Sequence, residues 1–331
     1  MLRLKTLSAS ALLLATAAAT AQFTDVINSN RPGESMSAFS VGKTVLQGEL
    51  GITGVKEDHA NLGWDSKGLA NELTIRYGAF LEQLEFIGEF QHQWDRFNYP
   101  DVGISGQTRN ALKGFNFGAK YLVYDPNKKY IDRKPDLYSW RNNHKFKWRS
   151  LIPAVGVYLG GNLTLTDKFP LYGEKGFSAK GMVITQHQFG RFVLVTNIMA
   201  DKFGSNYETF GYVVTVTRGI NDRWSVFLEN QGLQSDIYGD LIFRGGAAYL
   251  LDGNIQLDVN VGANVKDTPS VLQAGIGLSW RFDGFYEDVL VRLPGEEKNM
   301  SKEDKKREKE KNKQQKKDKK RKDAIENEPI D

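Results

Sequence analysis

Hydrophobic and polar residues alternate along segment 270–282, SVLQAGIGLSWRF. The even positions from Leu272 to Phe282 are apolar, whereas the odd positions are mostly small or polar. Successive side chains of a strand leave opposite faces, so this segment predicts a strand with one apolar face that ends in Trp280 and Phe282. A soluble sandwich would bury that face, whereas a transmembrane barrel would turn it toward lipid, with aromatic residues at the interface.

Similar segments recur upstream of this one. We predict twelve strands, at 44–54, 69–80, 84–96, 111–124, 150–164, 177–188, 191–201, 207–218, 222–231, 237–250, 254–264 and 270–282. The alternation is sharpest near the end, where Leu257 and Val259 flank the polar Asp258. The fifth segment contains LIPAVGVYLGG and is apolar on both faces, so the pattern does not decide which face lies inside.

The predicted connections alternate in length. Short connections with the Gly, Asn or Asp of tight turns occur at 188–190, 219–222 and 251–254. Longer connections occur at 55–68, 97–110 and 165–176. An even strand count with short turns at one end is typical of outer-membrane barrels, so we predict an all-β, antiparallel up-and-down barrel over 43–283. A soluble sandwich is the alternative, and the uninterrupted run of segments favours the barrel.

The N-terminus predicts export. Residues 1–21 have the charged start, apolar core and small-residue cleavage site of a signal peptide, which leaves Gln22 as the first mature residue. Export places the chain outside the cytoplasm, so we expect no nucleic acid partner. Residues 22–42 form a polar, Ser-rich lead-in without periodicity, and whether they plug the bore is left open.

Composition narrows the chemistry. The chain has 331 residues and no cysteine, which excludes disulfides, thiolate metal sites and a lipoprotein anchor. Beyond the N-terminus it has no apolar run of about 18 residues, so no transmembrane helix is predicted. The basic tail, 284–331, has a Lys/Glu-rich run at 296–323 that is too polar to fold alone. With an even strand count we predict both termini in the periplasm, on the same side as the long basic connection 125–149.

Several stretches are similar to a known family of bacterial outer-membrane barrels. The run 27–35 (INSNRPGES) resembles the family's opening, although Asn30 stands where Asp is usual. Other similar pieces are Gly42, Gln47, Glu49, 219–229, 245–257 and 275–282. The family is labelled transporter-like or MetA pathway of phenol degradation-like. The resemblance covers about residues 27–282, implies an outer-membrane barrel and a Bacteroidota-type source, and supplies no catalytic residue.

Charged residues on the strands are predicted to face the lumen, because a charge on the lipid face costs about 2–4 kcal/mol near the midplane. These lumen residues are Arg76, Glu85, Glu89, Lys120, Arg218, Glu229, Arg244, Asp258 and Arg281. They either pair and fill the bore, or line a narrow pore that biases which solutes pass. On the outside we expect membrane lipids, with Trp280 and Phe282 as the assembly signal for the barrel-assembly machinery.

No motif for catalysis, a metal or a cofactor is present, and we predict none of them. Among the histidines, His92 is predicted on the lipid face, but no serine lies two residues away. The leading hypothesis is a passive channel for small solutes. The alternative is a non-conducting accessory or scaffold barrel of an outer-membrane assembly or secretion complex, docking through 125–149 and 296–323. A lipid hydrolase around His92 is the weakest hypothesis.

Overall fold

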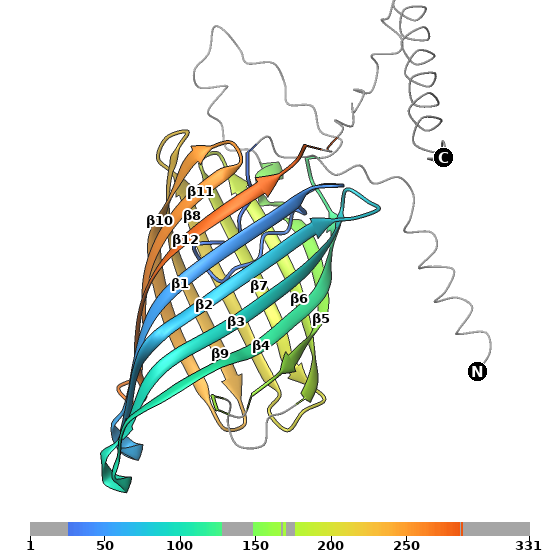
Figure 1. Ribbon diagram of the computed structural model, residues 1–331. Coiled ribbons are helices and arrows are strands. Elements are labelled where there is room, and N and C mark those ends of the chain that lie inside the picture. Colours follow the sequence, from blue (N-terminus) through green and yellow to red (C-terminus); the bar gives the residue numbers. More distant parts are fainter. Residues whose placement is uncertain (1–25, 128–147, 167, 170–175, 285, 287–331) are drawn as a thin grey trace, which may run out of the picture. The chain divides into compact units, whose positions relative to one another are not determined.

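The strands form a closed antiparallel barrel (Figure 1). The computed structural model describes residues 26–127, 148–166, 168–169, 176–284 and 286. Within these ranges each strand pairs with its neighbours in chain order, and the last strand closes the barrel against the first. The predicted fold class, a twelve-stranded up-and-down barrel, is therefore confirmed. The predicted signal peptide, most of 125–149 and nearly all of the tail lie outside the described residues.

The strand bounds agree best with the sequence pattern near the end of the chain. The strands are β1 (Leu46–His59), β2 (Trp64–Gly78), β3 (Leu84–Tyr99), β4 (Ile104–Tyr124), β5 (Ala154–Thr164), β6 (Gly176–Phe189), β7 (Phe192–Phe203), β8 (Thr209–Gly219), β9 (Trp224–Ser235), β10 (Gly239–Asp252), β11 (Ile255–Asn264) and β12 (Ser270–Phe282). Short 3-10 helices occur at η1 (Ala60–Leu62), η2 (Pro100–Val102) and η3 (Trp148–Leu151). The bounds of β12 are the predicted ones.

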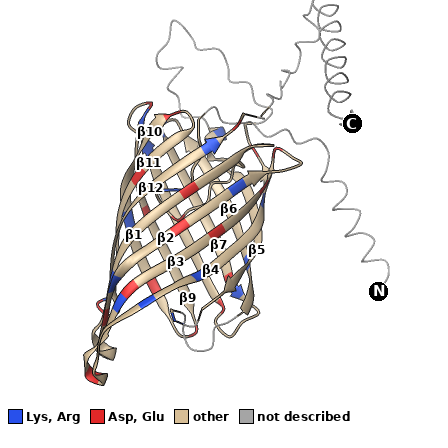
Figure 2. Ribbon diagram, viewed as in Figure 1, with Lys and Arg blue, Asp and Glu red and all other residues tan. Residues whose placement is uncertain are grey.

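The outside of the wall is apolar and the inside is polar. Along β12, Ile276 and Trp280 are exposed, whereas Ser279 and Arg281 are buried. Figure 2 shows that Lys, Arg, Asp and Glu occur along the strands as well as at the rims. An apolar wall around a polar interior is the arrangement of barrels that span an outer membrane. Among the described residues, none of the helices is long and apolar enough to span a bilayer.

Two hairpins extend the wall at one end, which we name the hairpin end (Figure 1). β1 and β2 are separated only by residues 60–63, and β3 and β4 only by residues 100–103. The expectation of long loops at 55–68 and 97–110 is therefore wrong. Where a hairpin rises beyond a membrane, both of its faces meet water, so the apolar alternation that marks a strand fades.

The opposite end, which we name the turn end, receives the start of the described chain. Residues 26–45, the inner segment, enter the barrel there (Figure 1). The amide of Ile27 donates to the carbonyl of Gly253 at 2.8 Å, and the amide of Thr44 donates to that of Gly78 at 2.8 Å. Between these points the side chain of Met36 is buried within the barrel. The question left open by the sequence is thus answered, because most of the lead-in lies inside the bore.

The inner segment shares an apolar cluster with one side of the wall. Met36 and Ala38 of the segment pack with residues of β3 to β7, including Tyr158 and Ile184. On β5 the side chains of Ala154 and Tyr158 are almost fully buried. This explains why the fifth predicted strand has no polar face: one of its faces points outward and the other packs on the segment.

Candidate functional site

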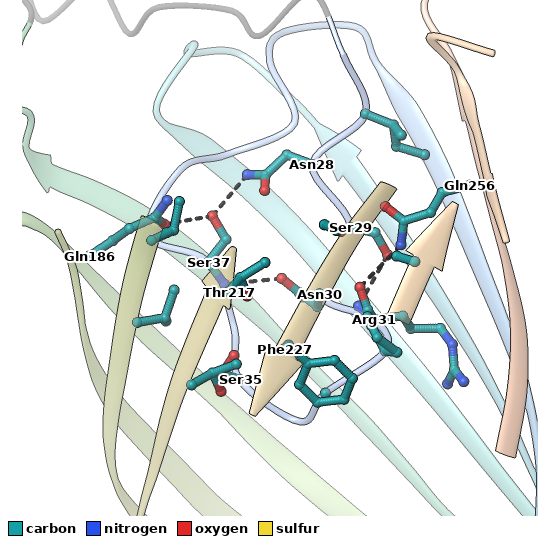
Figure 3. Close-up of a pocket in the computed structure, with 18 residues that line it drawn as sticks. Asn28, Ser29, Asn30, Arg31, Ser35, Ser37, Gln186, Thr217, Phe227 and Gln256 are labelled. Atoms are coloured by element: carbon teal, nitrogen blue, oxygen red, sulfur yellow. Dashed lines mark hydrogen bonds between the residues drawn. The ribbon is translucent and has the colours of Figure 1, made fainter. Parts of the chain in front are cut away.

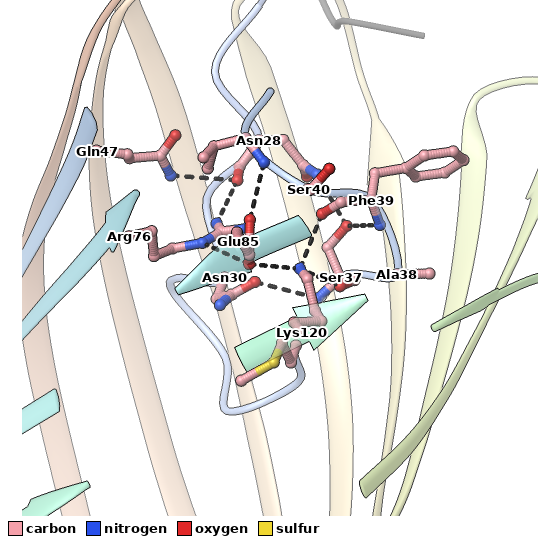
Figure 4. Close-up of polar contacts among 12 residues, drawn as sticks. Asn28, Asn30, Ser37, Ala38, Phe39, Ser40, Gln47, Arg76, Glu85 and Lys120 are labelled. Carbon is pink, nitrogen blue, oxygen red and sulfur yellow. Dashed lines mark hydrogen bonds and ion pairs between the residues drawn. The ribbon is translucent and has the colours of Figure 1, made fainter. Parts of the chain in front are cut away.

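Four charged side chains meet inside the barrel beside the inner segment, and three of them, Arg76, Glu85 and Lys120, are labelled in Figure 4. Arg76 contacts Glu49 at 3.1 Å and Glu85 at 3.0 Å, and the Lys120 Nζ lies 2.7 Å from Glu85 Oε1. Arg76 Nη1 also donates to the backbone carbonyl of Asn28, in the inner segment, at 2.7 Å. We name Glu49, Arg76, Glu85 and Lys120 the clamp. Its two positive and two negative charges balance, which a fully buried ion cluster requires.

The clamp also binds the second half of the inner segment, at residues 37–41. Lys120 Nζ donates to the backbone carbonyls of Ser37 at 2.7 Å and Phe39 at 2.8 Å. Glu85 Oε2 accepts from the backbone amide of Val41 at 2.8 Å. Buried backbone groups need partners, and the segment has no helix or strand of its own to supply them. The charged side chains of the wall therefore take the place of a strand ladder.

The far tip of the segment is held by Glu229 on β9. Its carboxylate accepts from the backbone amide of Glu34 at 3.0–3.1 Å and from that of Ser35 at 3.3 Å. Thr215 Oγ1 donates to the same carboxylate at 2.7 Å, and Arg244 Nη1 does so at 3.1 Å. One carboxylate thus joins the tip of the segment to three neighbouring strands.

Two further contacts complete the anchoring. Asn197 on β7 accepts from the Met36 amide at 2.6 Å and donates to the Met36 carbonyl at 2.9 Å, so one side chain satisfies both backbone groups. Arg31 of the segment donates to both oxygens of Asp258 on β11, at 3.2 and 3.3 Å. Asn197 is uncharged, and the charge of Arg31 is paired with that of Asp258, so neither contact leaves an uncompensated charge.

A cavity of about 200 Å³ remains between the inner segment and the opposite wall (Figure 3). Its wall side comes from strands β6 to β11 and includes Gln186, Thr217, Phe227 and Gln256. The segment therefore packs closely on strands β3 to β7 and leaves a space with a mixed polar and apolar lining toward β6 to β11.

Most of the sequence-predicted lumen residues lie inside the barrel. Buried side chains are found at Arg76, Glu85, Lys120, Glu229, Arg244, Asp258 and Arg281. Glu89 is half-buried and accepts from Asn116 Nδ2 at 3.1 Å. The structure brings Arg76, Glu85 and Lys120 together in the clamp and Glu229 next to Arg244. Arg281 lies apart at the turn end, where it pairs with Asp283 at 3.1 Å.

Arg218 is a correction to the predicted lumen set. Its side chain is exposed on the outer face of β8, and its guanidinium carbon lies 5.2 Å from the ring centre of Phe192. It shares this face with Tyr212 and Val216, because residues two apart on a strand point the same way. Arg218 lies near the end of β8, which explains why a charge is accepted on the outer face there. A long cationic side chain at a membrane rim extends its charge into water.

Trp280 and Phe282 are exposed on the outer face of the last strand, as their alternation indicates. Their ring centres are 6.0 Å apart, and both lie at the turn end. Aromatic residues at a barrel rim occupy the membrane interface. Their role as an assembly signal stays a prediction.

Sequence reasoning missed the partners that matter most for the inner segment, namely Arg31, Glu49 and Asn197. Two of them left a signal. Glu49 has the inward parity of the polar residues in its strand, and Asn197 is a lone amide within an otherwise apolar stretch, VLVTNIM. The pattern does not predict the position of the Arg31 side chain, because its segment has no periodicity.

His92 lies on the outer face near the aromatic wall of β3 and β4. Its ring nitrogens contact Asn71 Nδ2 at 3.1 Å and Asn110 Oδ1 at 2.7 Å. Both partners are amides, and a hydrolase would need a nucleophilic hydroxyl in one of these places. The contacts of His92 therefore give the lipid-hydrolase hypothesis no support.

The architecture defines a class: a membrane-type β-barrel whose bore holds a segment of its own chain. Within that class, the chain belongs to the family described as putative MetA-pathway of phenol degradation, whose model matches residues 29–282. The matched stretch includes the barrel and most of the inner segment. No curated protein matches the sequence.

Three solved barrels that are similar to this chain are distant from it in sequence. An outer membrane channel from Pseudomonas putida F1 is 11% identical, with 77% of this chain and 100% of that chain covered and a TM-score of 0.49. A KdgM porin in complex with disordered oligogalacturonate is 11% identical, with 70% of this chain and 99% of that chain covered and a TM-score of 0.41. The CymD monoaromatic hydrocarbon channel is 10% identical, with 72% of this chain and 88% of that chain covered and a TM-score of 0.38. These TM-scores are too low to transfer a solute or a mechanism.

Proposed function

We propose that the protein is a passive outer-membrane channel for small solutes, with both termini in the periplasm and the inner segment narrowing its bore. One observation carries the proposal: the segment fills only part of the bore and leaves a cavity against strands β6 to β11 whose lining includes many hydroxyl and amide groups. A barrel that served only as a scaffold would gain stability by packing that space with apolar side chains. Polar space beside a polar segment instead suits the passage of water and small solutes.

The lumen charges were expected either to pair and fill the bore or to line a narrow pore, and the proposal contains both a filled side and a path. The clamp charges pair with each other, so they fill one side of the bore and do not select ions. Through the backbone bonds of Lys120 and Glu85 they also set the position of the inner segment. The segment, more than any single charge, then determines the width of the remaining path.

The inner segment can move without breaking the wall. Its only backbone–backbone bonds to the barrel, among the described residues, are made at its ends by Ile27, Thr44 and Val45. Between them the segment is held by side chains such as Asn197 and Glu229. Release of these side-chain contacts would widen the bore and leave every strand ladder intact.

Single-channel conductance in planar bilayers tests the proposal. The full mature chain should show a small conductance with brief rises, and a variant lacking 26–42 should show a steadily larger one, because the bore loses its occupant. A third variant, lacking 296–331, serves as the control and should conduct like the full chain. A folded barrel that does not conduct in any of the three forms would refute the channel.

The scaffold alternative depends on segments outside the described residues. The connection 125–149 and the run 296–323 would supply its docking surface, and nearly all of both falls in 128–147 and 287–331. A periplasmic partner for them stays a prediction, as do the Bacteroidota-type source and recognition of the last strand by the barrel-assembly machinery.

A further inference from the structure

The cavity beside the inner segment has the size of a small solute. Its volume is about 200 Å³. A water molecule takes up about 30 Å³ in the liquid, so the space equals roughly six or seven waters. Pockets for drug-sized ligands begin at about 300 Å³. The cavity therefore suits a single sugar-sized ring and is too small for an oligomer.

Hydroxyl and amide groups surround this space. They belong to Asn and Ser residues of the inner segment and, on the wall, to Gln186, Thr217, Ser225 and Gln256 among others. One aromatic ring, Phe227, and the apolar side chains of Val195 and Ala248 lie on the wall side. A lining of this kind can bind a molecule that has hydroxyls around its edge and a less polar face.

The one positive charge of the lining is compensated by a carboxylate just outside it. Arg31 is its one charged side chain, and the carboxylate of Asp258 holds it at 3.2 and 3.3 Å. An ionic solute would bring a charge that no group of the lining compensates, and burying an unpaired charge is costly. The electrostatics thus favour an uncharged solute.

Several polar groups of the lining are available to a ligand. Thr217 and Ser225 form no side-chain hydrogen bond to another described residue. Gln186 uses its Oε1 for Ser37 and for the amide of Ala38, which leaves its Nε2 donors. Gln256 uses its Nε2 for the carbonyl of Arg31, which leaves its Oε1 acceptor. The residues of the lining therefore offer both unused donors and unused acceptors.

We infer that this cavity binds a small, uncharged polyhydroxylated solute, such as a monosaccharide or a cyclic polyol, with its less polar face against Phe227. A sugar ring offers several hydroxyls that can each donate and accept, which matches the free groups of Thr217, Ser225, Gln186 and Gln256. The inference rests on the proposed function, because the solute would occupy the path through the bore.

Direct binding to the full chain in detergent micelles tests the inference without any need for conductance. The probes are D-glucose and myo-inositol, measured by isothermal titration calorimetry, with sodium gluconate as the charged comparison. The unchanged protein should bind at least one neutral probe saturably and gluconate at least tenfold more weakly. The double variant Thr217→Val, Ser225→Ala keeps side-chain size and should weaken binding roughly tenfold, because two hydrogen-bonding groups are lost.

Two further variants keep the test decisive. Phe227→Leu removes the aromatic face and should also weaken binding. Thr53→Val changes a hydroxyl of β1 on the same inner face as Glu49 but outside the cavity lining, and should have no effect. Saturable binding without conductance would refute the channel and support the site. Conductance without saturable binding of a neutral probe, or a preference for gluconate, would overturn the site and leave the channel standing.

Discussion

Arg76 Nη1 donates a hydrogen bond to the backbone carbonyl oxygen of Asn28 at 2.7 Å, and this contact joins strand β2 to the segment inside the bore. The same guanidinium pairs with Glu49 and Glu85. A single side chain therefore links the wall, the clamp and the occupant of the bore, and a change at this point affects both stability and conductance.

The substitution Arg76→Met should destabilise the barrel strongly. It leaves Lys120 as the only cation beside the buried carboxylates of Glu49 and Glu85. Removing one partner of a buried ion cluster costs about 3–5 kcal/mol. The midpoint of urea unfolding in micelles, followed by tryptophan fluorescence, measures the loss.

Arg218→Met is the matched control for that experiment. It removes the same side-chain type from the outer face, where the contact with Phe192 contributes about 0.5–1 kcal/mol. Equal shifts of the unfolding midpoint in both variants would contradict the role assigned to the clamp.

The substitution Asn197→Leu should release the tip of the inner segment more often. Leucine fills similar space but makes neither hydrogen bond to Met36. Two such bonds contribute about 2 kcal/mol together, so the released fraction should rise roughly thirtyfold. Bilayer recordings would show longer high-conductance periods. Thr196→Val, at the neighbouring outward position on β7, should leave the recordings unchanged, and a similar effect of both substitutions would argue against a gating segment.

A disulfide between positions 38 and 156 should lock the inner segment to β5. A Cβ on Gly156 would lie 3.2 Å from the carbonyl oxygen and 3.5 Å from the Cα of Ala38, so the two backbones approach closely at this point. The chain has no native cysteine, so Ala38→Cys with Gly156→Cys introduces the only pair. The oxidised variant should stay in the low-conductance state, and a reducing agent should restore the fluctuations. Each single cysteine variant should be insensitive to the reducing agent.

Replacing Trp280 and Phe282 by alanine should lower the amount of assembled barrel in the membrane. Both side chains lie at the outer rim of the closing strand, where the assembly machinery and the membrane interface would meet them. Membrane fractions compared by heat-modifiable gel mobility give the measurement. Alanine at Phe210, an exposed outer residue at the hairpin end of β8, is the control. Normal assembly of the double variant would show that Trp280 and Phe282 are not the assembly signal.

The sequence predicts the wall best where one face of a strand meets lipid and the other meets polar groups. β11 and β12 fulfil this condition, and their bounds follow from the alternation alone. The prediction fails where that contrast disappears. At the hairpin end, where β1 to β4 extend the wall, the contrast between the two faces fades, and on β5 both faces are apolar, one of them packing through Tyr158 on the inner segment.

The contents of the bore are harder to predict than its wall. The inner segment has no period, because its backbone groups bond to side chains from distant strands such as Asn197 and Glu229 rather than to a regular ladder. Single-residue parity predicts that Arg76, Glu85 and Lys120 point inward, but not that they meet. Parity also places Arg218 with the outward residues of β8, and only its position near the rim makes a charge acceptable there.

The pairing of β1 with β12 has a consequence for the order of folding. The wall closes only when the last strand to be synthesised reaches the first, and β1 follows directly on the inner segment. The segment is thus enclosed by the same event that completes the wall. If the seam formed first, residues 26–45 would have to thread back through the mouth, so this segment needs to be in place when the final strand arrives.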